Sequence, residues 1–294
     1  MVRFRLLIGL LLFVSFSFGQ ISYSGIIDKY PIELAIEIYP EGTSNGVYVY
    51  TNIDEPIDLN GKLTGAGLIL YEKDRQKKNT GVFTFARFRK NDISIEGTWK
   101  NLLTGKQLKV ILTKKFDIEG SFNGQYKDEE LIVPSSLKNQ YFKLLLTMGA
   151  GDASTRVTGI KIFEKKTDQL VQQLEMDCAF IGFNTLQLGD FNFDGFTDFS
   201  VFETSYAGPN TSSIYFLYNP QTKLFFESGF SGVSLQFDAK TKTIVEENQC
   251  CAGSKLTRVI YKVVKNKMVV KAQYCFTWNE NKNMLVKQKW KNCE

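Results

Sequence analysis

Residues 32–38 read Ile-Glu-Leu-Ala-Ile-Glu-Ile, with a large apolar side chain at every second position. Successive side chains of a β-strand point to opposite faces, so this period of two predicts a strand with one buried face. The 294-residue chain also holds 24 Phe and 13 Tyr but only 6 Pro, which favours sheet over helix. We therefore expect a mainly β protein.

Short runs of the same kind continue to residue 126, separated by turn signals such as residues 41–46 and 103–106. The strand candidates after residue 38 are residues 47–50, 57–63, 68–71, 82–88, 93–99, 108–113 and 118–126. Regular short strands with tight turns predict an antiparallel meander, either an up-and-down barrel or a strongly curled sheet. We assign this N-terminal β-meander domain to residues 20–126.

Residues 127–140 contain charges, Pro134 and two serines, and we expect them to form a linker. A second domain then covers residues 141–294. Its strand candidates are residues 142–148, 157–163, 169–176, 186–189, 199–204, 214–218, 224–226, 243–247, 257–264, 268–276 and 284–289. Without a long amphipathic helix, this pattern predicts a β-sandwich-like domain.

Residues 1–19 have the composition of a secretory signal peptide: Arg3 and Arg5, an apolar stretch at residues 6–14, then Ser17 and Gly19 before a cleavage site. A retained N-terminal anchor is the alternative. The mature protein is expected to be exported, periplasmic or extracellular, with no membrane span, because no later stretch is apolar for ~18 residues. The net charge of the whole chain, +5, is too small to indicate a nucleic-acid partner.

The chain contains no histidine, which excludes Ser-His-Asp and Cys-His catalysis and zinc sites with His ligands. The five cysteines are Cys178, Cys250, Cys251, Cys275 and Cys293. In an exported protein most should form disulfide bonds, and an odd number leaves one over. Because direct pairing of adjacent cysteines is strained, we expect Cys250 or Cys251 to reach Cys275 across neighbouring strands.

Residues 190–198 read Asp-Phe-Asn-Phe-Asp-Gly-Phe-Thr-Asp, the strongest chemical signal in the sequence. Calcium takes ~6–8 oxygen ligands, and a loop that curls at Gly195 can aim alternate side chains at one point. The predicted ligands are Asp190, Asn192, Asp194, Asp198 and the carbonyl oxygen of Phe196. The alternative is an acidic turn with an Asx-type cap.

The loop is not an EF-hand, because Val201 stands where a bidentate Glu would be at position 12. Glu203 is a candidate to complete the coordination shell. No partner base is apparent nearby, so we expect a structural calcium rather than a catalytic one.

Residues 189–199, together with Tyr206-Ala207-Gly208-Pro209-Asn210 and the strand 215–219, resemble a bacterial family of exported calcium-binding proteins. That family includes immunity proteins against peptidoglycan-cleaving effectors and is similar in fold to periplasmic inhibitors of invertebrate-type lysozyme. The resemblance covers residues 170–229, in the second domain only. It implies that the calcium loop lies near a surface loop, here residues 204–212, that plugs an enzyme's substrate cleft.

The contact residues implied in that loop are Ser205, Tyr206, Gly208 and Asn210; Tyr is an efficient anchor, and Ser, Gly and Asn offer adaptable hydrogen bonds. An ordinary hairpin connection is the alternative.

The leading functional hypothesis is an exported, non-enzymatic calcium-binding protein that inhibits, or gives immunity against, a secreted peptidoglycan hydrolase. A calcium-stabilised carbohydrate- or surface-binding adhesion module is the alternative, with Trp99, Trp278 or Trp290 stacking on sugars. A hydrolase that uses Asp152 and Glu203 as a carboxylate pair is a third possibility.

Overall fold

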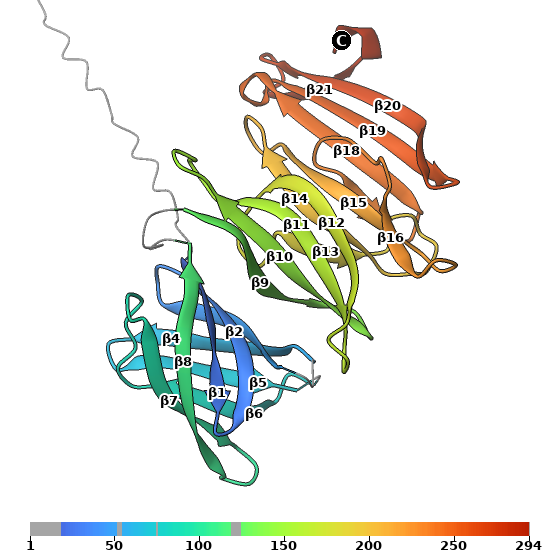
Figure 1. Cartoon of the computed structure of the whole chain (residues 1–294). Coiled ribbons are helices and arrows are strands. Elements are labelled where there is room, and N and C mark those ends of the chain that lie inside the picture. Colours follow the sequence, from blue (N-terminus) through green and yellow to red (C-terminus); the bar gives the residue numbers. More distant parts are fainter. Residues whose placement is uncertain (1–18, 52–54, 75, 119–124, 294) are drawn as a thin grey trace, which may run out of the picture.

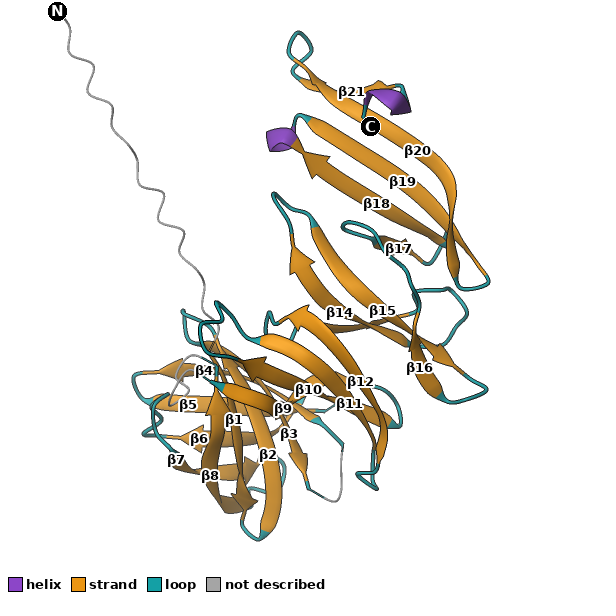
Figure 2. Ribbon diagram, turned by 45° about the horizontal axis from the view of Figure 1, so that its top comes forward, coloured by secondary structure: helices purple, strands orange, loops and turns teal. Residues whose placement is uncertain are grey.

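The computed structural model describes residues 19–51, 55–74, 76–118 and 125–293. It is built almost entirely of β-strands, as predicted, and helix in the described residues is limited to two 3-10 turns, η1 (Cys251–Gly253) and η2 (Trp290–Asn292) (Figures 1 and 2). The predicted signal peptide lies outside the described residues apart from Gly19. Within the described ranges no helix is long and apolar enough to cross a membrane.

The first eight strands form a closed antiparallel barrel in sequence order, and β8 returns to pair with β1. Of the two predicted forms, the structure therefore takes the up-and-down barrel. The strands are β1 (Gly19–Ile27), β2 (Tyr30–Ile38), β3 (Thr43–Tyr50), β4 (Ile57–Thr64), β5 (Gly67–Lys73), β6 (Asn79–Phe85), β7 (Ser94–Asn101) and β8 (Gln107–Asp117).

Strand β2 shows how the sequence pattern places the barrel against the rest of the chain. Ile32, Leu34 and Ile36 are buried in the barrel's interior cluster. Ala35 points the other way and is also buried, in a second cluster that includes strands after the barrel. The small side chain at this outward position lets the neighbouring strands approach the barrel wall.

Three antiparallel sheets follow, with strand orders β12-β11-β10-β9, β13-β14-β15-β16 and β17-β18-β19-β20-β21. Their strands are β9 (Tyr126–Ser136), β10 (Gln140–Met148), β11 (Arg156–Glu164), β12 (Leu170–Ala179), β13 (Leu186–Gly189), β14 (Asp198–Ser205), β15 (Thr211–Asn219), β16 (Leu224–Glu227), β17 (Gln236–Asp238), β18 (Thr243–Cys250), β19 (Lys255–Val264), β20 (Lys267–Asn279) and β21 (Met284–Gln288). We call the β9–β12 sheet the second sheet, the β13–β16 sheet the middle sheet and the β17–β21 sheet the terminal sheet.

The segment that we predicted to be a linker, residues 127–140, is mostly strand β9. Leu131, Ile132 and Val133 are buried and pack in the shared cluster, so their burial outweighs the charges around them. Pro134 is tolerated because β9 is at the edge of its sheet, where a missing N–H costs no ladder bond.

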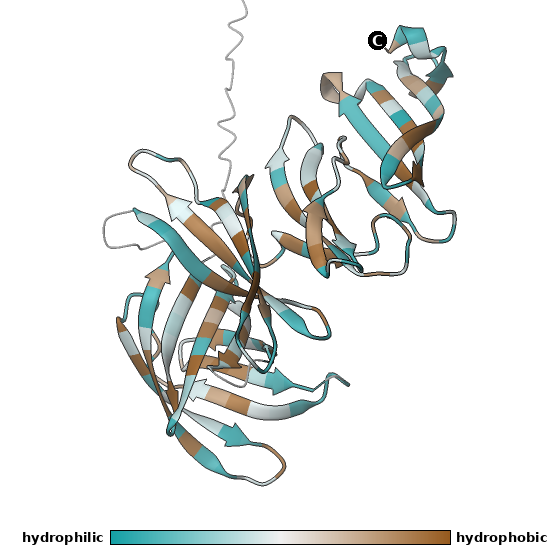
Figure 3. Cartoon of the chain, turned by 45° about the vertical axis from the view of Figure 1, so that its right-hand side comes forward, coloured by the Kyte–Doolittle hydropathy of each residue, from teal (hydrophilic) through white to brown (hydrophobic). Residues whose placement is uncertain are grey.

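The three sheets stack face to face, the middle one between the other two (Figure 2). Phe142 of β10 packs against Phe199 of β14, with ring centroids 5.3 Å apart, which gives the sandwich-like core that the sequence predicts. The other face of the middle sheet meets the terminal sheet through a smaller cluster around Tyr215 and Ile244. Hydrophobic and hydrophilic bands alternate along the strands (Figure 3).

An ion-pair network joins the barrel to the second sheet. Lys143 of β10 is almost fully buried, and its Nζ lies 3.0 Å from a Glu33 oxygen on β2 and 3.4 Å from a Glu130 oxygen on β9. Lys161 of β11 contacts the other oxygen of Glu130 at 2.6 Å. These charges compensate one another, which a buried lysine requires.

The disulfide pairing differs from our prediction. Cys275 bonds to Cys293, which lies beyond β21 at the end of η2, and not to Cys250 or Cys251. The reason is the strand order: β19 lies between β18, which ends at Cys250, and β20, which carries Cys275, so these cysteines are not on neighbouring strands.

Candidate calcium loop and partner loop

The predicted calcium loop joins β13 to β14 and curls tightly on itself. Phe193 and Gly195 both take left-handed backbone conformations, at φ 64° and 92°. The Asp190 carboxylate sits inside this curl, where Oδ1 accepts the N–H of Asp194 at 3.0 Å and Oδ2 accepts that of Gly195 at 2.9 Å. Position 1 of the motif thus points into the loop.

Positions 3 and 5 also turn inward. Asn192 Oδ1 accepts the Asp194 N–H at 3.2 Å, and its amide nitrogen donates to Asp194 Oδ2 at 2.8 Å. Asp194 Oδ1 accepts the N–H of Phe196 at 2.9 Å. These are the side-chain-to-backbone bonds of Asx turns, the local structure that the alternative interpretation predicts. The side chain of Phe196 is 44% exposed, and the role of its carbonyl oxygen as a ligand stays a prediction.

Asp198 lies differently from the other motif residues. It is fully buried, and its two oxygens accept the backbone N–H groups of Tyr218 at 2.9 Å and Phe191 at 2.8 Å. Burial raises the pKa of Asp198 to about 6 against the opposing effect of these two bonds, and the charges of Asp194 and Asp190 raise it further. This carboxylate therefore ties the loop and β14 to β15.

The donor set fits a hard cation in its chemistry. In the described part of the chain, no three acidic, Cys or His side chains gather as a ready metal cluster. The loop nevertheless brings together the carboxylate oxygens of Asp190 and Asp194 and the amide oxygen of Asn192, which are calcium ligands and poor ligands for soft metals. A carboxylate has about four lone-pair sites, so those of Asp190 and Asp194 keep acceptor capacity beyond their N–H bonds.

Glu203 does not complete this set, since it lies five residues along β14 from Asp198, roughly 16 Å at strand spacing.

The loop also rests on the hairpin tips of the terminal sheet. Asn192 Nδ2 donates to Asn266 Oδ1 at 3.0 Å, and Lys242 Nζ donates to the carbonyl oxygen of Phe193 at 3.3 Å. A conformational change in the loop would therefore alter hydrogen bonds to two turns of the terminal sheet, the β17–β18 turn and the β19–β20 turn.

The predicted partner loop, between β14 and β15, projects one aromatic side chain. Tyr206 is 52% exposed, and Ser205 and Gly208 are exposed beside it, Gly208 with φ 72°. Asn210 is buried instead. Its Nδ2 donates to the Gln249 carbonyl at 2.7 Å and its Oδ1 accepts the Gln249 N–H at 3.1 Å, so Asn210 anchors the loop and does not present itself to a partner.

The two predicted loops lie at opposite ends of β14. Tyr206 follows Asp198 by eight positions, which is about 26 Å in an extended strand. The resemblance to the immunity-protein family implied that the calcium loop and the recognition loop are close together. The antiparallel connections before and after β14 keep them apart. Two strands link them: β14 itself, and β18, which begins next to Lys242 at the calcium loop and carries Gln249, the hydrogen-bond partner of Asn210, near its other end.

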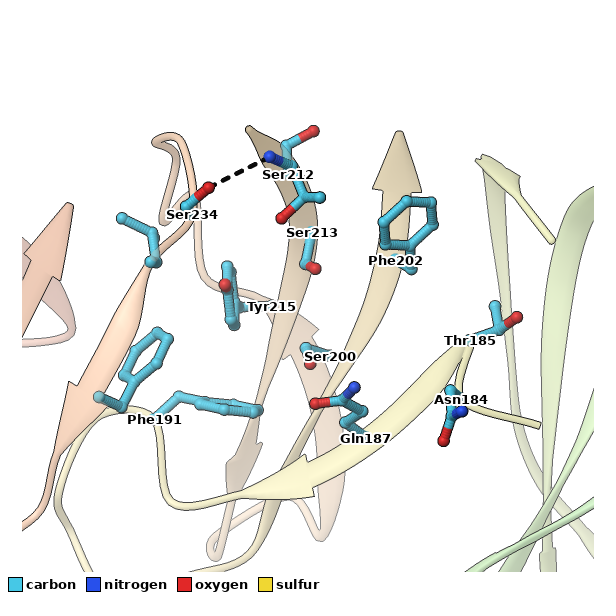
Figure 4. A pocket seen from close by; sticks show the side chains of 13 residues that line it. Asn184, Thr185, Gln187, Phe191, Ser200, Phe202, Ser212, Ser213, Tyr215 and Ser234 are labelled. Carbon is cyan, nitrogen blue, oxygen red and sulfur yellow. Dashed lines mark hydrogen bonds between the residues drawn. The ribbon is translucent and has the colours of Figure 1, made fainter. Parts of the chain in front are cut away.

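A cleft of about 230 Å³ runs along the middle sheet between the two loops (Figure 4). Its lining comes from Phe191 of the calcium loop, from Thr211 and Ser212 after the partner loop, and from Asn184, Thr185, Gln187, Ser200, Phe202, Ser213, Tyr215, Ser234, Leu235 and Phe237. Hydroxyl, amide and aromatic groups alternate there, with no charged side chain. Sequence reasoning missed this cleft because its residues come from several separate strands.

The other residues singled out from the sequence are dispersed. Asp152 lies in the exposed turn between β10 and β11 and accepts the Gly149 N–H at 2.6 Å, whereas Glu203 belongs to β14. Trp99 donates to Glu72 at 2.9 Å in the barrel, and Trp278 is 44% exposed on β20. Trp290 begins η2.

Comparison with known proteins adds little. No family model matches the chain, and no curated protein matches it. Among solved structures, the crystal structure of a protein from Lactobacillus plantarum covers 92% of this chain and 95% of its own, at 12% identity and a TM-score of 0.22. A similarity this weak informs neither fold nor function.

Proposed function

We propose that this chain is an exported, non-enzymatic calcium-binding protein whose β14–β15 loop contacts a cell-envelope partner, with a peptidoglycan hydrolase as the first candidate. The observation that carries the proposal is the loop at residues 190–194, in which the Asp190 carboxylate turns inward. Strand β14 connects this loop to the exposed side chain of Tyr206. The complete lack of histidine supports a binding role over acid–base catalysis.

The proposed role of calcium is structural. Asp190 and Asp194 crowd two negative charges into one turn close to the buried Asp198, and like charges at this range oppose one another. A divalent cation offsets that repulsion and holds the loop against β15 and the terminal sheet. No step of a reaction is assigned to it.

Calorimetric titration of the purified chain with calcium chloride tests the metal site. We expect uptake of one ion, and Asp194→Asn should weaken it roughly tenfold or more, because ligand charge sets calcium affinity. Asp74→Asn is the matched control, since Asp74 caps a barrel turn by accepting the N–H groups of Gln76 and Lys78 outside any calcium motif. Absence of calcium uptake by the unmodified chain would end the proposal.

The partner loop is tested by inhibition of a panel of peptidoglycan hydrolases in the presence of calcium. Exposed tyrosines anchor interfaces, so Tyr206→Ala should reduce inhibition at least tenfold. Tyr71→Ala, on the barrel and 38% exposed, provides a control of equal chemistry. No inhibition of any hydrolase at micromolar protein would exclude the inhibitor role.

The cleft on the middle sheet favours a second candidate, the binding of neutral carbohydrate. Aromatic faces beside hydroxyl and amide groups, without a charge, suit a sugar ring that has apolar and polar sides. Gln187 is exposed at the rim, so Gln187→Leu should abolish signals on a glycan array without changing calcium uptake. An array with no signal removes this candidate and leaves the first untouched.

A further inference from the structure

The five cysteines divide into three chemically distinct groups. Cys275 and Cys293 form the disulfide, and Cys178 is fully buried, where burial raises its pKa to about 12. A thiol of that kind is unreactive near neutral pH. The remaining two, Cys250 and Cys251, are adjacent in sequence and both exposed, and their sulfur atoms lie 2.7 Å apart.

The backbone brings these two thiols together. Neighbouring side chains of an extended strand point to opposite faces, so adjacent cysteines in β18 would face apart. Cys250 is extended, but Cys251 and Ala252 take left-handed conformations with φ 58° and 53°. This turn swings the Cys251 side chain to the side of Cys250. Left-handed backbone is unfavourable for non-glycine residues, so the surrounding structure must hold this turn in place.

The thiol pair faces the partner loop across a pocket of about 610 Å³. Residues 206–210 form one wall and residues 249–253 the other, and none of them carries a charge. The connection between the walls is direct, because Asn210 hydrogen bonds to both backbone groups of Gln249, the residue before Cys250. The position of the thiol turn and the position of the partner loop are therefore coupled through one side chain.

We propose that Cys250 and Cys251 are a redox modification site: in an oxidising compartment they form a vicinal disulfide, which makes the rigid apolar wall of this pocket and fixes the partner loop. One thiolate attacks the disulfide of a small or protein oxidant and releases the first thiol. The second cysteine then attacks the mixed disulfide and releases the other. Two protein thiols thus become one disulfide, while one oxidant disulfide becomes two thiols.

The effect on the partner loop rests on the proposed function of that loop, whereas the existence of the vicinal disulfide does not.

Counting free thiols tests the disulfide. The full chain is incubated with glutathione disulfide, denatured without reductant and treated with a maleimide. We expect one modified cysteine, Cys178, and a tryptic peptide 243–255 that is lighter by two hydrogen atoms than after reduction. Three modified cysteines, or Cys250 joined to another chain, would overturn the proposal. In the Cys250→Ser chain no second thiol resolves the mixed disulfide, so Cys251 should retain one glutathione that the unmodified chain lacks.

Hydrogen exchange tests the coupling. The Tyr206 N–H bonds to the Asn210 carbonyl at 2.8 Å and reports on closure of the loop. Its exchange should be several-fold slower in the oxidised chain than after the exposed pair is reduced. The Cys250→Ser/Cys251→Ser chain should show no dependence on redox reagent. Equal exchange in the oxidised and reduced chains would overturn control of the loop, whatever the hydrolase assays show.

Discussion

The barrel and the terminal sheet are both antiparallel meanders, yet they are held together in different ways. The barrel closes on itself, so it has no edge and encloses an apolar cluster that includes Leu34, Phe83 and Phe85. In the described strands of the terminal sheet only Thr243, Ile244, Val259 and Cys275 are buried. Strand pattern alone therefore does not determine stability, which depends on what covers the faces of each sheet.

The distribution of charged residues also distinguishes the terminal sheet from the rest of the chain. Residues 236–294 contain 12 Lys and Arg against 5 Asp and Glu, while residues 1–235 contain 24 against 26. Lys287 lies over the Tyr274 ring at 4.4 Å, so part of this positive charge covers an aromatic surface of the terminal sheet. With a thin core and like charges, the terminal sheet should depend on its disulfide and on its contacts with the calcium loop.

The largest loss of stability should come from a substitution in the barrel core. Phe83 is fully buried and packs edge-on against Tyr48 at 5.2 Å, so Phe83→Ala should lower the free energy of unfolding by about 3–5 kcal/mol in urea titrations. Val270→Ala on the terminal sheet, 50% exposed, should cost less than about 0.5 kcal/mol. Equal losses at the two positions would contradict the comparison.

The second-largest loss of stability should come from removing the disulfide, and it should be confined to the terminal sheet. The Cys275–Cys293 bond closes a loop with a sequence separation of 18, and removing such a constraint with Cys293→Ser should cost about 3 kcal/mol. Hydrogen exchange should accelerate in β18–β21 and remain unchanged in β1–β8. Faster exchange in the barrel amides would show that the two regions unfold as one unit.

The sequence predicted strands well because alternation of apolar side chains is a local property. It did not predict β9, where the charges and Pro134 masked the buried run of residues 131–133. Disulfide pairing, the burial of Asn210 and the distance between the two loops depend on how strands pair and stack, which single residues do not encode. Calcium binding stays a prediction: the oxygen donors of residues 190–194 could be found because they are close in sequence, whereas the burial of Asp198 against β15 could not.

The junction between the barrel and the second sheet should respond to pH. Burial alone would raise the pKa of Glu130, but the hydrogen bond from Lys161 and the charges of Lys143 and Lys161 lower it overall. Because the folded-state pKa lies below the unfolded value of about 4.3, this stabilisation is present above that value and is lost as pH falls through the folded pKa.

The pKa of Lys143 is raised, since Glu33 and Glu130 outweigh the opposing effect of burial. Its stabilisation is therefore present below the unfolded value of about 10.4 and lost as pH rises through the folded pKa. Thermal unfolding as a function of pH should show both losses, and Glu130→Gln should flatten the acid side. An acid slope that is unchanged by Glu130→Gln would assign it to other carboxylates.

The smallest effect should isolate the link between the calcium loop and the terminal sheet. Asn266→Gly removes the hydrogen bond from Asn192 and keeps the left-handed backbone at φ 57°, so it should cost about 1 kcal/mol, the usual value of one such bond. Calcium should then still bind, but it should no longer slow hydrogen exchange in the β19–β20 hairpin, because its effect reaches that hairpin through Asn192. If calcium protects the hairpin equally in both chains, the coupling runs instead through Lys242 and the Phe193 carbonyl, and Lys242→Ala should abolish it.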